Sequence, residues 1–268
     1  MNETPLHPVI YVLFFALGAI IGSFLNVCIH RIPRGASIVR PGSRCPACAA
    51  PIAFHDNIPL VSYVLLKGRC RKCGRPIPVR YPLVELLTGC IFLVFCLALG
   101  LSVDLPVLLA FACLLVVISF IDIDFRIIPY RLSLGGLGLG LALSPLRPSF
   151  GIVHALAGAI GGCGLIYAIK KSYELLRKGE GMGGGDVWLL GMIGAFCGLR
   201  GVVFSLVAGS LIGCLVGVPL TLAKGGGMKY AIPFGPFLSA GALLYALAGG
   251  GLIHRFYALI DLLPGLMR

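Results

Sequence analysis

Long apolar segments are the feature that most constrains this chain. Eight of them run along its 268 residues, and most approach the roughly 20 residues that a helix needs to cross a bilayer. They are Val9–Ile29, Leu83–Gly100, Leu105–Ile123, Leu132–Leu146, Ile152–Ile169, Val187–Leu199, Val202–Leu222 and Ala231–Gly249. Backbone in lipid must satisfy its own hydrogen bonds, so such segments form helices. The sequence therefore predicts an all-α polytopic membrane protein with about eight transmembrane helices.

The composition excludes the other broad classes. Only 12% of the residues are charged, whereas soluble domains average about 25%, and 58% are hydrophobic, which excludes a disordered chain. Glycine is abundant, at 38 residues. In a membrane protein this excess predicts helices that approach one another closely through small residues.

The net charge of +12 follows from an asymmetric distribution of basic residues. If the N-terminus lies outside, the inner connections hold eighteen of the 22 Lys and Arg residues, and the outer ones hold four. These inner connections are 30–82, 124–131, 170–186 and 223–230. The positive-inside rule then predicts an extracytoplasmic N-terminus and a cytosolic 30–82 segment. The basic excess is an orientation signal beside an anionic leaflet, so we predict no nucleic-acid partner. Because Met1–Pro8 carries no Lys or Arg, we expect a retained first span rather than a signal peptide.

The 30–82 connection contains two Cys-x-x-Cys pairs. Cys45 and Cys48 form the first pair, and Cys70 and Cys73 form the second after 21 intervening residues. This spacing is typical of a structural zinc site with four thiolate ligands. Two disulfides are the alternative, which the predicted cytosolic location disfavours. We call this segment the cysteine module and predict a zinc-ribbon-like fold for it.

Ten acidic residues are few enough to consider one by one, and two of them stand out. Asp122 lies near the predicted inner end of the third apolar segment, and Asp186 at the predicted inner start of the sixth. Ionisable groups at membrane depth are costly and therefore functional candidates. Two nearby carboxylates would share one proton, as in aspartic proteases. The alternative is a helix cap at Asp186 and interfacial ion pairs.

A third acid, Asp124, is not expected to take part in such a pair. Residues two apart on a helix point to nearly opposite faces, so Asp122 and Asp124 cannot both face one site. We expect Asp124 to pair with Arg126 or Arg131. Two roles remain open for Arg80 and Glu85. They are either charged contacts for a ligand, or an ion pair that anchors the cysteine module to the second span.

Several motifs together resemble those of bacterial type IV prepilin peptidases. They are Gly22-Ser-Phe-Leu-Asn-Val27, Asp56-Asn-Ile-Pro-Leu60, the paired cysteines, Arg80-Tyr-Pro-Leu-Val-Glu85, Phe120-Ile-Asp122-Ile-Asp124 with Ile128-Pro129, and Gly183-x-Gly185-Asp186. The last is similar to the Gly-x-Gly-Asp signature of intramembrane aspartic proteases. One departure is Tyr130, where the family usually has Asp.

The resemblance implies a bifunctional enzyme of the bacterial inner membrane. Its catalytic aspartates map onto Asp122 and Asp186. Its substrates are type IV prepilins and type II secretion pseudopilins, from which it removes a short basic leader at the cytosolic face. It also implies methylation of the new N-terminus with S-adenosylmethionine, an activity associated with the cysteine module; no cofactor-binding residue can be assigned from the sequence.

The expected domains are a first helix (1–29), the cysteine module (30–82) and a membrane peptidase domain (83–268). Three alternatives from other classes remain on the residues alone. The first is a transport or secretion-channel subunit with intramembrane carboxylates, although no internal repeat supports it. The second is a zinc-module methyltransferase without protease activity. The third is a zinc ribbon that recruits a protein or RNA.

Overall fold

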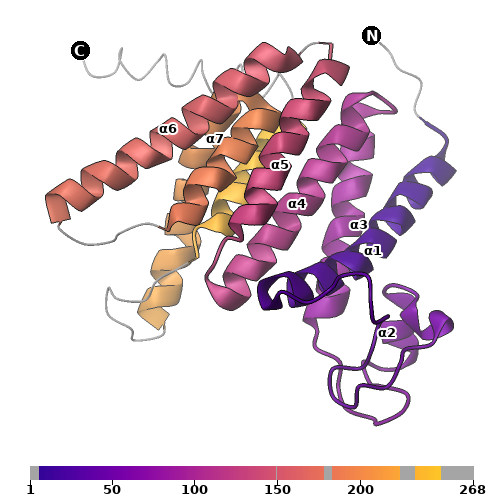
Figure 1. Ribbon diagram of the computed structural model, residues 1–268. Coiled ribbons are helices and arrows are strands. Elements are labelled where there is room, and N and C mark those ends of the chain that lie inside the picture. Colours follow the sequence, from indigo (N-terminus) through magenta and orange to yellow (C-terminus); the bar gives the residue numbers. More distant parts are fainter. Residues whose placement is uncertain (1–5, 149, 178–182, 224–232, 249–268) are drawn as a thin grey trace. The chain divides into compact units, whose positions relative to one another are not determined.

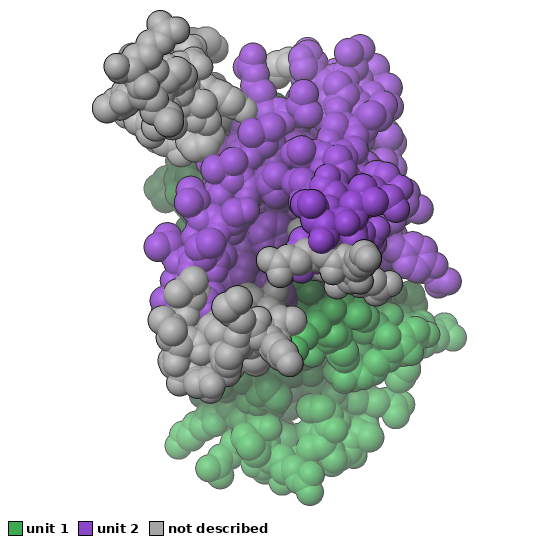
Figure 2. Space-filling view, turned by 90° about the vertical axis from the view of Figure 1, so that its left-hand side faces the viewer, with its two compact units in different colours: residues 1–129 green, residues 130–268 purple. Residues whose placement is uncertain are grey.

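The computed structural model describes residues 6–148, 150–177, 183–223 and 233–248. The regular secondary structure in these ranges is helical, and no strand is present in them apart from two isolated bridges in the cysteine module. The described chain divides into two compact units, residues 1–129 and 130–268, which are coloured separately in Figure 2. Each unit is described by itself below.

The first unit contains three long helices and the cysteine module. Its elements are α1 (Pro8–Arg31), η1 (Ile32–Arg34), η2 (Phe54–Asn57), α2 (Val61–Leu65), α3 (Arg80–Leu99) and α4 (Asp104–Phe125). Figure 1 shows α1, α3 and α4 packed together, with the cysteine module beyond one end of α1 and α3. Fully buried side chains such as Phe95 and Phe111 fill the core between the long helices.

Glycines set the close approach of α1 and α3. A Cβ atom added at Gly22 would lie 2.8 Å from the Cα atom of Glu85, and one at Gly18 would lie 2.7 Å from the carbonyl oxygen of Thr88. Neither position has room for a side chain, because real Cβ atoms do not approach backbone this closely. The predicted small-residue packing is therefore present, and it brings Glu85 directly beside α1.

The second unit contains the remaining helices. They are α5 (Tyr130–Leu143), η3 (Ser144–Leu146), α6 (Gly151–Arg177), α7 (Gly184–Ala223) and the short helix Gly235–Ala248. Helix α6 packs along α7 (Figure 1). Gly158 of α6 and Gly194 of α7 meet backbone to backbone, since a Cβ at either position would collide with the carbonyl oxygen of the other. The surplus of glycine is again used for helix contacts.

The eight predicted apolar segments coincide with helices, with one difference. The sixth and seventh, Val187–Leu199 and Val202–Leu222, are two helical stretches of α7 that meet at Gly198 without a loop. Gly198 has φ +70°, ψ −178°, a conformation that glycine adopts readily. Arg200, which lies between the sixth and seventh predicted segments, is therefore within α7.

Among the residues that the structure describes, five helices are long and apolar enough to cross a membrane: α1, α3, α4, α6 and α7. Helix α5 and helix Gly235–Ala248 are shorter. The prediction of a multi-pass helical membrane protein is confirmed. Residues 231, 232 and 249 of the last predicted segment, and parts of the connections 170–186 and 223–230, lie outside the described residues.

Candidate active site and metal centre

The four predicted zinc ligands lie together in one cluster. The Sγ atoms of Cys45, Cys48, Cys70 and Cys73 all lie within 4.8 Å of one another, and those of Cys45 and Cys73 are 3.9 Å apart. Sulfur atoms around a tetrahedral ion with Zn–S bonds of about 2.3 Å are separated by about 3.8 Å. The cluster therefore has the dimensions of a four-thiolate metal centre, and all four cysteines are free thiols rather than disulfides.

The two pairs form matching backbone turns. The N–H of Cys45 donates to the carbonyl oxygen of Ala50 at 2.9 Å, and the N–H of Cys70 donates to that of Arg75 at the same distance. The residue after each pair is left-handed, Ala49 with φ 55° and Gly74 with φ 67°. Glycine adopts this conformation without steric cost at Gly74, whereas Ala49 adopts it although it carries a Cβ atom. These repeated turns point both cysteine pairs toward one centre.

The pKa values of two of the four thiols are shifted in opposite directions. Despite a backbone hydrogen bond at Arg75, burial and the neighbouring cysteine thiols raise the pKa of Cys73 to about 11. Backbone N–H groups of Cys73 and Lys72 hydrogen-bond the Cys70 sulfur and lower the pKa of that thiol to about 6. A thiolate, and not a thiol, is the form that ligates metals. Nearby, Arg71 holds Asp56 through a two-pronged ion pair, with Nε to Oδ2 at 2.8 Å and Nη2 to Oδ1 at 2.7 Å. This contact lowers the pKa of the Asp56 carboxyl and ties η2 to the second cysteine turn.

The cysteine module is also fastened to the helices above it. The Oε2 atom of Glu85 in α3 accepts a hydrogen bond of 2.9 Å from the N–H of Leu60, the residue that precedes α2. The Nδ2 atom of Asn26 in α1 donates to the carbonyl oxygen of Tyr81 at 3.0 Å. Glu85 therefore anchors the cysteine module through a backbone hydrogen bond rather than through the ion pair considered from the sequence.

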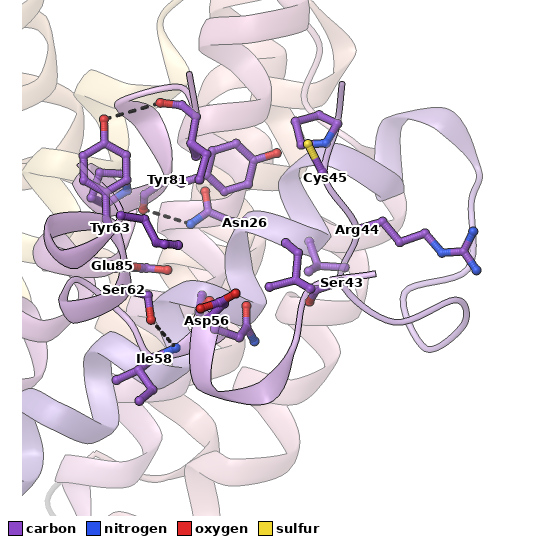
Figure 3. A pocket seen from close by; sticks show the side chains of 18 of the residues that line it. Asn26, Ser43, Arg44, Cys45, Asp56, Ile58, Ser62, Tyr63, Tyr81 and Glu85 are labelled. Atoms are coloured by element: carbon purple, nitrogen blue, oxygen red, sulfur yellow. Dashed lines mark hydrogen bonds between the residues drawn. The ribbon is translucent and has the colours of Figure 1, made fainter. Parts of the chain in front are cut away.

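A cavity of about 340 Å³ lies between the cysteine module and the adjoining ends of α1 and α3. Figure 3 shows side chains that line it, among them Asn26 of α1, Glu85 of α3, and Tyr63 and Asp56 of the cysteine module. Sequence reasoning missed Asn26, Ser62 and Tyr63. Only the polar Asn26 within an apolar segment gave any signal, because an uncharged polar residue at such a position needs partners.

Asp122 and Asp124 occupy different environments in α4. Asp122 is only 5% exposed, four residues before the left-handed Arg126 that ends the helix. Asp124 is exposed and accepts a hydrogen bond from Arg80 Nη1 of α3. The expectation that Asp124 pairs with Arg126 or Arg131 is thus replaced by a pair with Arg80, which α3 brings to the end of α4. Arg131 instead donates to the hydroxyl of Tyr130 at 3.2 Å.

Asp186 lies in the first turn of α7 and is 8% exposed. Three glycines precede it, and Gly183 leaves room beside the carboxylate, since a Cβ there would lie 3.6 Å from Asp186 Oδ2. A carboxylate in the first turn of a helix interacts favourably with the backbone N–H groups that are unpaired there. Asp122 belongs to the first compact unit and Asp186 to the second.

These features define a class: a multi-pass helical membrane protein with a four-thiolate module and a buried carboxylate near the end of each of two long apolar helices. Comparison with known proteins identifies a family within this class. A model described as the bacterial peptidase A24 N-terminal domain matches residues 16–99, and one described as the type IV leader peptidase family matches residues 109–218.

Curated relatives agree with the family models. The chain is 35% identical to the prepilin leader peptidase/N-methyltransferase of Aeromonas hydrophila, over 91% of this chain and 92% of that protein. It is 33% identical to that of Pseudomonas aeruginosa, over 94% of each. Identity reaches 41% with that of Myxococcus xanthus, where the match spans 81% of this chain and 65% of the relative. No solved structure matches. The chain belongs to the type IV leader peptidase family.

Proposed function

We propose that this enzyme cleaves the leader peptide from prepilins with Asp122 and Asp186 as its catalytic pair, and N-methylates the product. The family and the names of the relatives support both activities. One observation supports the residue assignment: each of the two acids is buried in a long apolar helix, close to one of its ends. A buried carboxylate at membrane depth is costly, and such residues are retained for function.

The chemistry that we propose follows from the acids themselves. In a site of low dielectric constant, two adjacent carboxyl groups do not both ionise, and they hold one proton between them. The ionised carboxylate takes a proton from a water molecule, which attacks the scissile carbonyl carbon, while the protonated partner polarises the carbonyl oxygen. Gly183 and Gly185 leave space for the substrate backbone beside Asp186.

The cysteine module is proposed to hold one zinc ion through Cys45, Cys48, Cys70 and Cys73. The separation of the sulfur atoms and the free thiols support it. Four thiolates complete the tetrahedral coordination of zinc, so the ion would be structural. It would hold together a segment in which the only helices are η1, η2 and the five-residue α2.

The functional division we propose is a first helix (1–29), the zinc module (30–82) and the peptidase domain (83–268), with both aspartates in the last. The protein would be a bacterial inner-membrane protein with its N-terminus outside and the zinc module in the cytosol, as the distribution of Lys and Arg predicts. Pseudopilins would be substrates as well as prepilins, and anionic lipids would contact the basic inner connections. Reporter fusions that placed residues 35–79 outside the cell would contradict this orientation.

The test is to compare Asp122→Asn, Asp186→Asn and Asp124→Asn in detergent-purified protein. Asn keeps the size of Asp but cannot ionise, so either of the first two changes should lower the rate of prepilin cleavage at least 1000-fold. Asp124→Asn should retain a rate within about tenfold of the wild type. Mass spectrometry reports leader loss and methyl gain separately, and methylation of an already cleaved pilin should survive in all three variants. Near wild-type cleavage by Asp122→Asn or Asp186→Asn would exclude the assignment.

A further inference from the structure

The cavity between the cysteine module and the ends of α1 and α3 has the volume of a small-molecule site. Its volume of about 340 Å³ lies within the range of about 300–1,000 Å³ that is typical of small-molecule sites. It is lined by α1, by α3 and by both halves of the cysteine module, and Tyr63 and Tyr81 contribute aromatic side chains. Its mixed polar and aromatic lining matches a small molecule better than it matches an apolar helix of a pilin.

Asn26 lines this cavity, and its side chain has a buried hydrogen-bond acceptor that no described residue uses. Its side chain is 2% exposed, and its Nδ2 atom donates to two carbonyl oxygens, those of Gly22 at 3.3 Å and Tyr81 at 3.0 Å. These two bonds fix the orientation of the amide, because only its nitrogen can donate. The Oδ1 atom is buried and has no protein partner in the described chain. A buried acceptor without a partner is costly, and a bound donor would remove the cost.

Glu85 adds negative charge to the same cavity. It is 8% exposed, and its carboxylate accepts a hydrogen bond of 2.9 Å from the Leu60 N–H. Within the described ranges no basic side chain forms a salt bridge with it. A buried carboxylate is stabilised by a cation. Arg31 and Arg44 also line the cavity. The cavity therefore suits a ligand with hydrogen-bond donors that carries a positive charge for Glu85 and a negative charge, such as an amino-acid carboxylate, for these guanidinium groups.

We propose that this cavity binds S-adenosylmethionine, an inference that rests on the methyltransferase activity proposed above. That molecule carries a sulfonium and an ammonium group, which match Glu85, and an aminopurine and a ribose, which supply donors for Asn26 Oδ1 and a ring to pack against tyrosine. When bound, it supplies a methyl group to an amine that has lost its proton, and S-adenosylhomocysteine remains. The N-terminal ammonium group of the pilin is also a cation with N–H donors. It is much smaller than S-adenosylmethionine, so this group alone does not fill a cavity of this size.

The location explains how zinc would affect methylation without any contact with the methyl donor. Cys45 lines the cavity with its neighbour Pro46, and Asp56 of the lining is held by Arg71 beside Cys70. Loss of the metal would therefore open one wall of the cavity. Asp122 does not line it, so the proposed binding site does not include this proposed catalytic acid.

The experiment measures binding of S-adenosylmethionine to purified full-length protein by isothermal titration calorimetry, with no pilin present. Val27→Trp fills the cavity from α1, and the matched control Ile20→Trp places the same ring two turns away on an exposed face of that helix. We expect Val27→Trp to weaken binding more than tenfold and Ile20→Trp to leave it unchanged. Glu85→Gln keeps an acceptor for the Leu60 N–H but removes the charge, so it should also weaken binding at least tenfold. Zinc content and melting temperature verify that each variant is folded.

Two outcomes would overturn the inference. One is wild-type affinity for S-adenosylmethionine in both Val27→Trp and Glu85→Gln. The other is no binding by wild-type protein that cleaves prepilin in the same preparation, which would leave the proposed peptidase function intact. Conversely, the wild-type protein could bind S-adenosylmethionine, lose that affinity in these variants, and yet fail to cleave prepilin. That result would support the binding site and contradict the proposed peptidase function. A pilin-derived peptide amine is titrated in parallel, and a cavity that binds only this peptide would also exclude our choice of ligand.

Discussion

Arg80 Nη1 donates a hydrogen bond to Asp124 Oδ2, and this ion pair joins the first residue of α3 to the end of α4. Both side chains are about one-quarter exposed. The pair explains why an acid two residues from Asp122 need not belong to the catalytic machinery. It also fixes the end of α4 from which Asp122 projects, so it is expected to influence the position of that residue indirectly.

The first prediction concerns the strength of this ion pair. Asp124→Asn and Arg80→Gln should each lower the stability of the protein by about 1 kcal/mol, because partly exposed pairs contribute no more than this. The double variant should cost little more than either change alone, since one interaction is lost in all three. Thermal unfolding of the three variants and the wild type in detergent gives the coupling free energy between the two residues. Strictly additive losses would show that the two residues act independently.

The second prediction concerns the metal. Purified protein should contain one zinc ion per chain, and Cys45→Ser should release it because the remaining three thiolates leave the coordination incomplete. Cys90→Ser, at an exposed cysteine of α3, is the matched control and should keep the metal. Metal analysis by mass spectrometry and limited proteolysis of residues 35–79 report the two effects. Protein that lacks zinc, with all four thiols open to alkylation, would disprove the site.

The third prediction concerns helix packing in the second unit. Gly158→Ala should lower the free energy of unfolding by at least about 1 kcal/mol, because the added methyl group collides with the backbone of α7 at Gly194. Gly164→Ala is the matched control on the same helix, where a Cβ meets nothing within 4 Å. That change should be neutral or slightly stabilising, since Ala favours helix. Melting temperatures of the two variants should differ by several degrees, and equal values would contradict the packing.

The fourth prediction uses the two matching cysteine turns. Ala49 is left-handed, which costs an L-residue roughly 1 kcal/mol or more. Ala49→Gly should therefore stabilise the cysteine module, whereas Gly74→Ala at the equivalent position should destabilise it by a similar amount. A Cβ atom added at Gly74 would have no other atom within 4 Å, so the effect of Gly74→Ala is one of backbone conformation. Resistance of residues 35–79 to protease measures the stability of the cysteine module. It should be highest in Ala49→Gly, intermediate in the wild type and lowest in Gly74→Ala.

Much of this protein could be inferred from local patterns of residues. Apolar length fixes helices in lipid because backbone hydrogen bonds must close within the segment. Cysteine spacing fixes the two turns of the cysteine module because each pair needs only a few consecutive residues. The burial of Asp122 and exposure of Asp124 also agree with a simple helical argument. All of these features depend on neighbours in the chain.

Contacts between distant residues were decided only by the tertiary structure. The sequence offered Arg126 and Arg131 as partners for Asp124, but the packing of α3 on α4 brings Arg80 to it, 44 residues away in the chain. Likewise, Asn26, Glu85 and Tyr63 come from three separate elements, and they line one cavity because glycines draw α1 against α3 and hydrogen bonds hold the cysteine module beneath them. The sequence by itself therefore determined the helices, the cysteine turns and the candidate acids. The tertiary structure decided which side chains meet, because that depends on how closely surfaces far apart in the chain can approach.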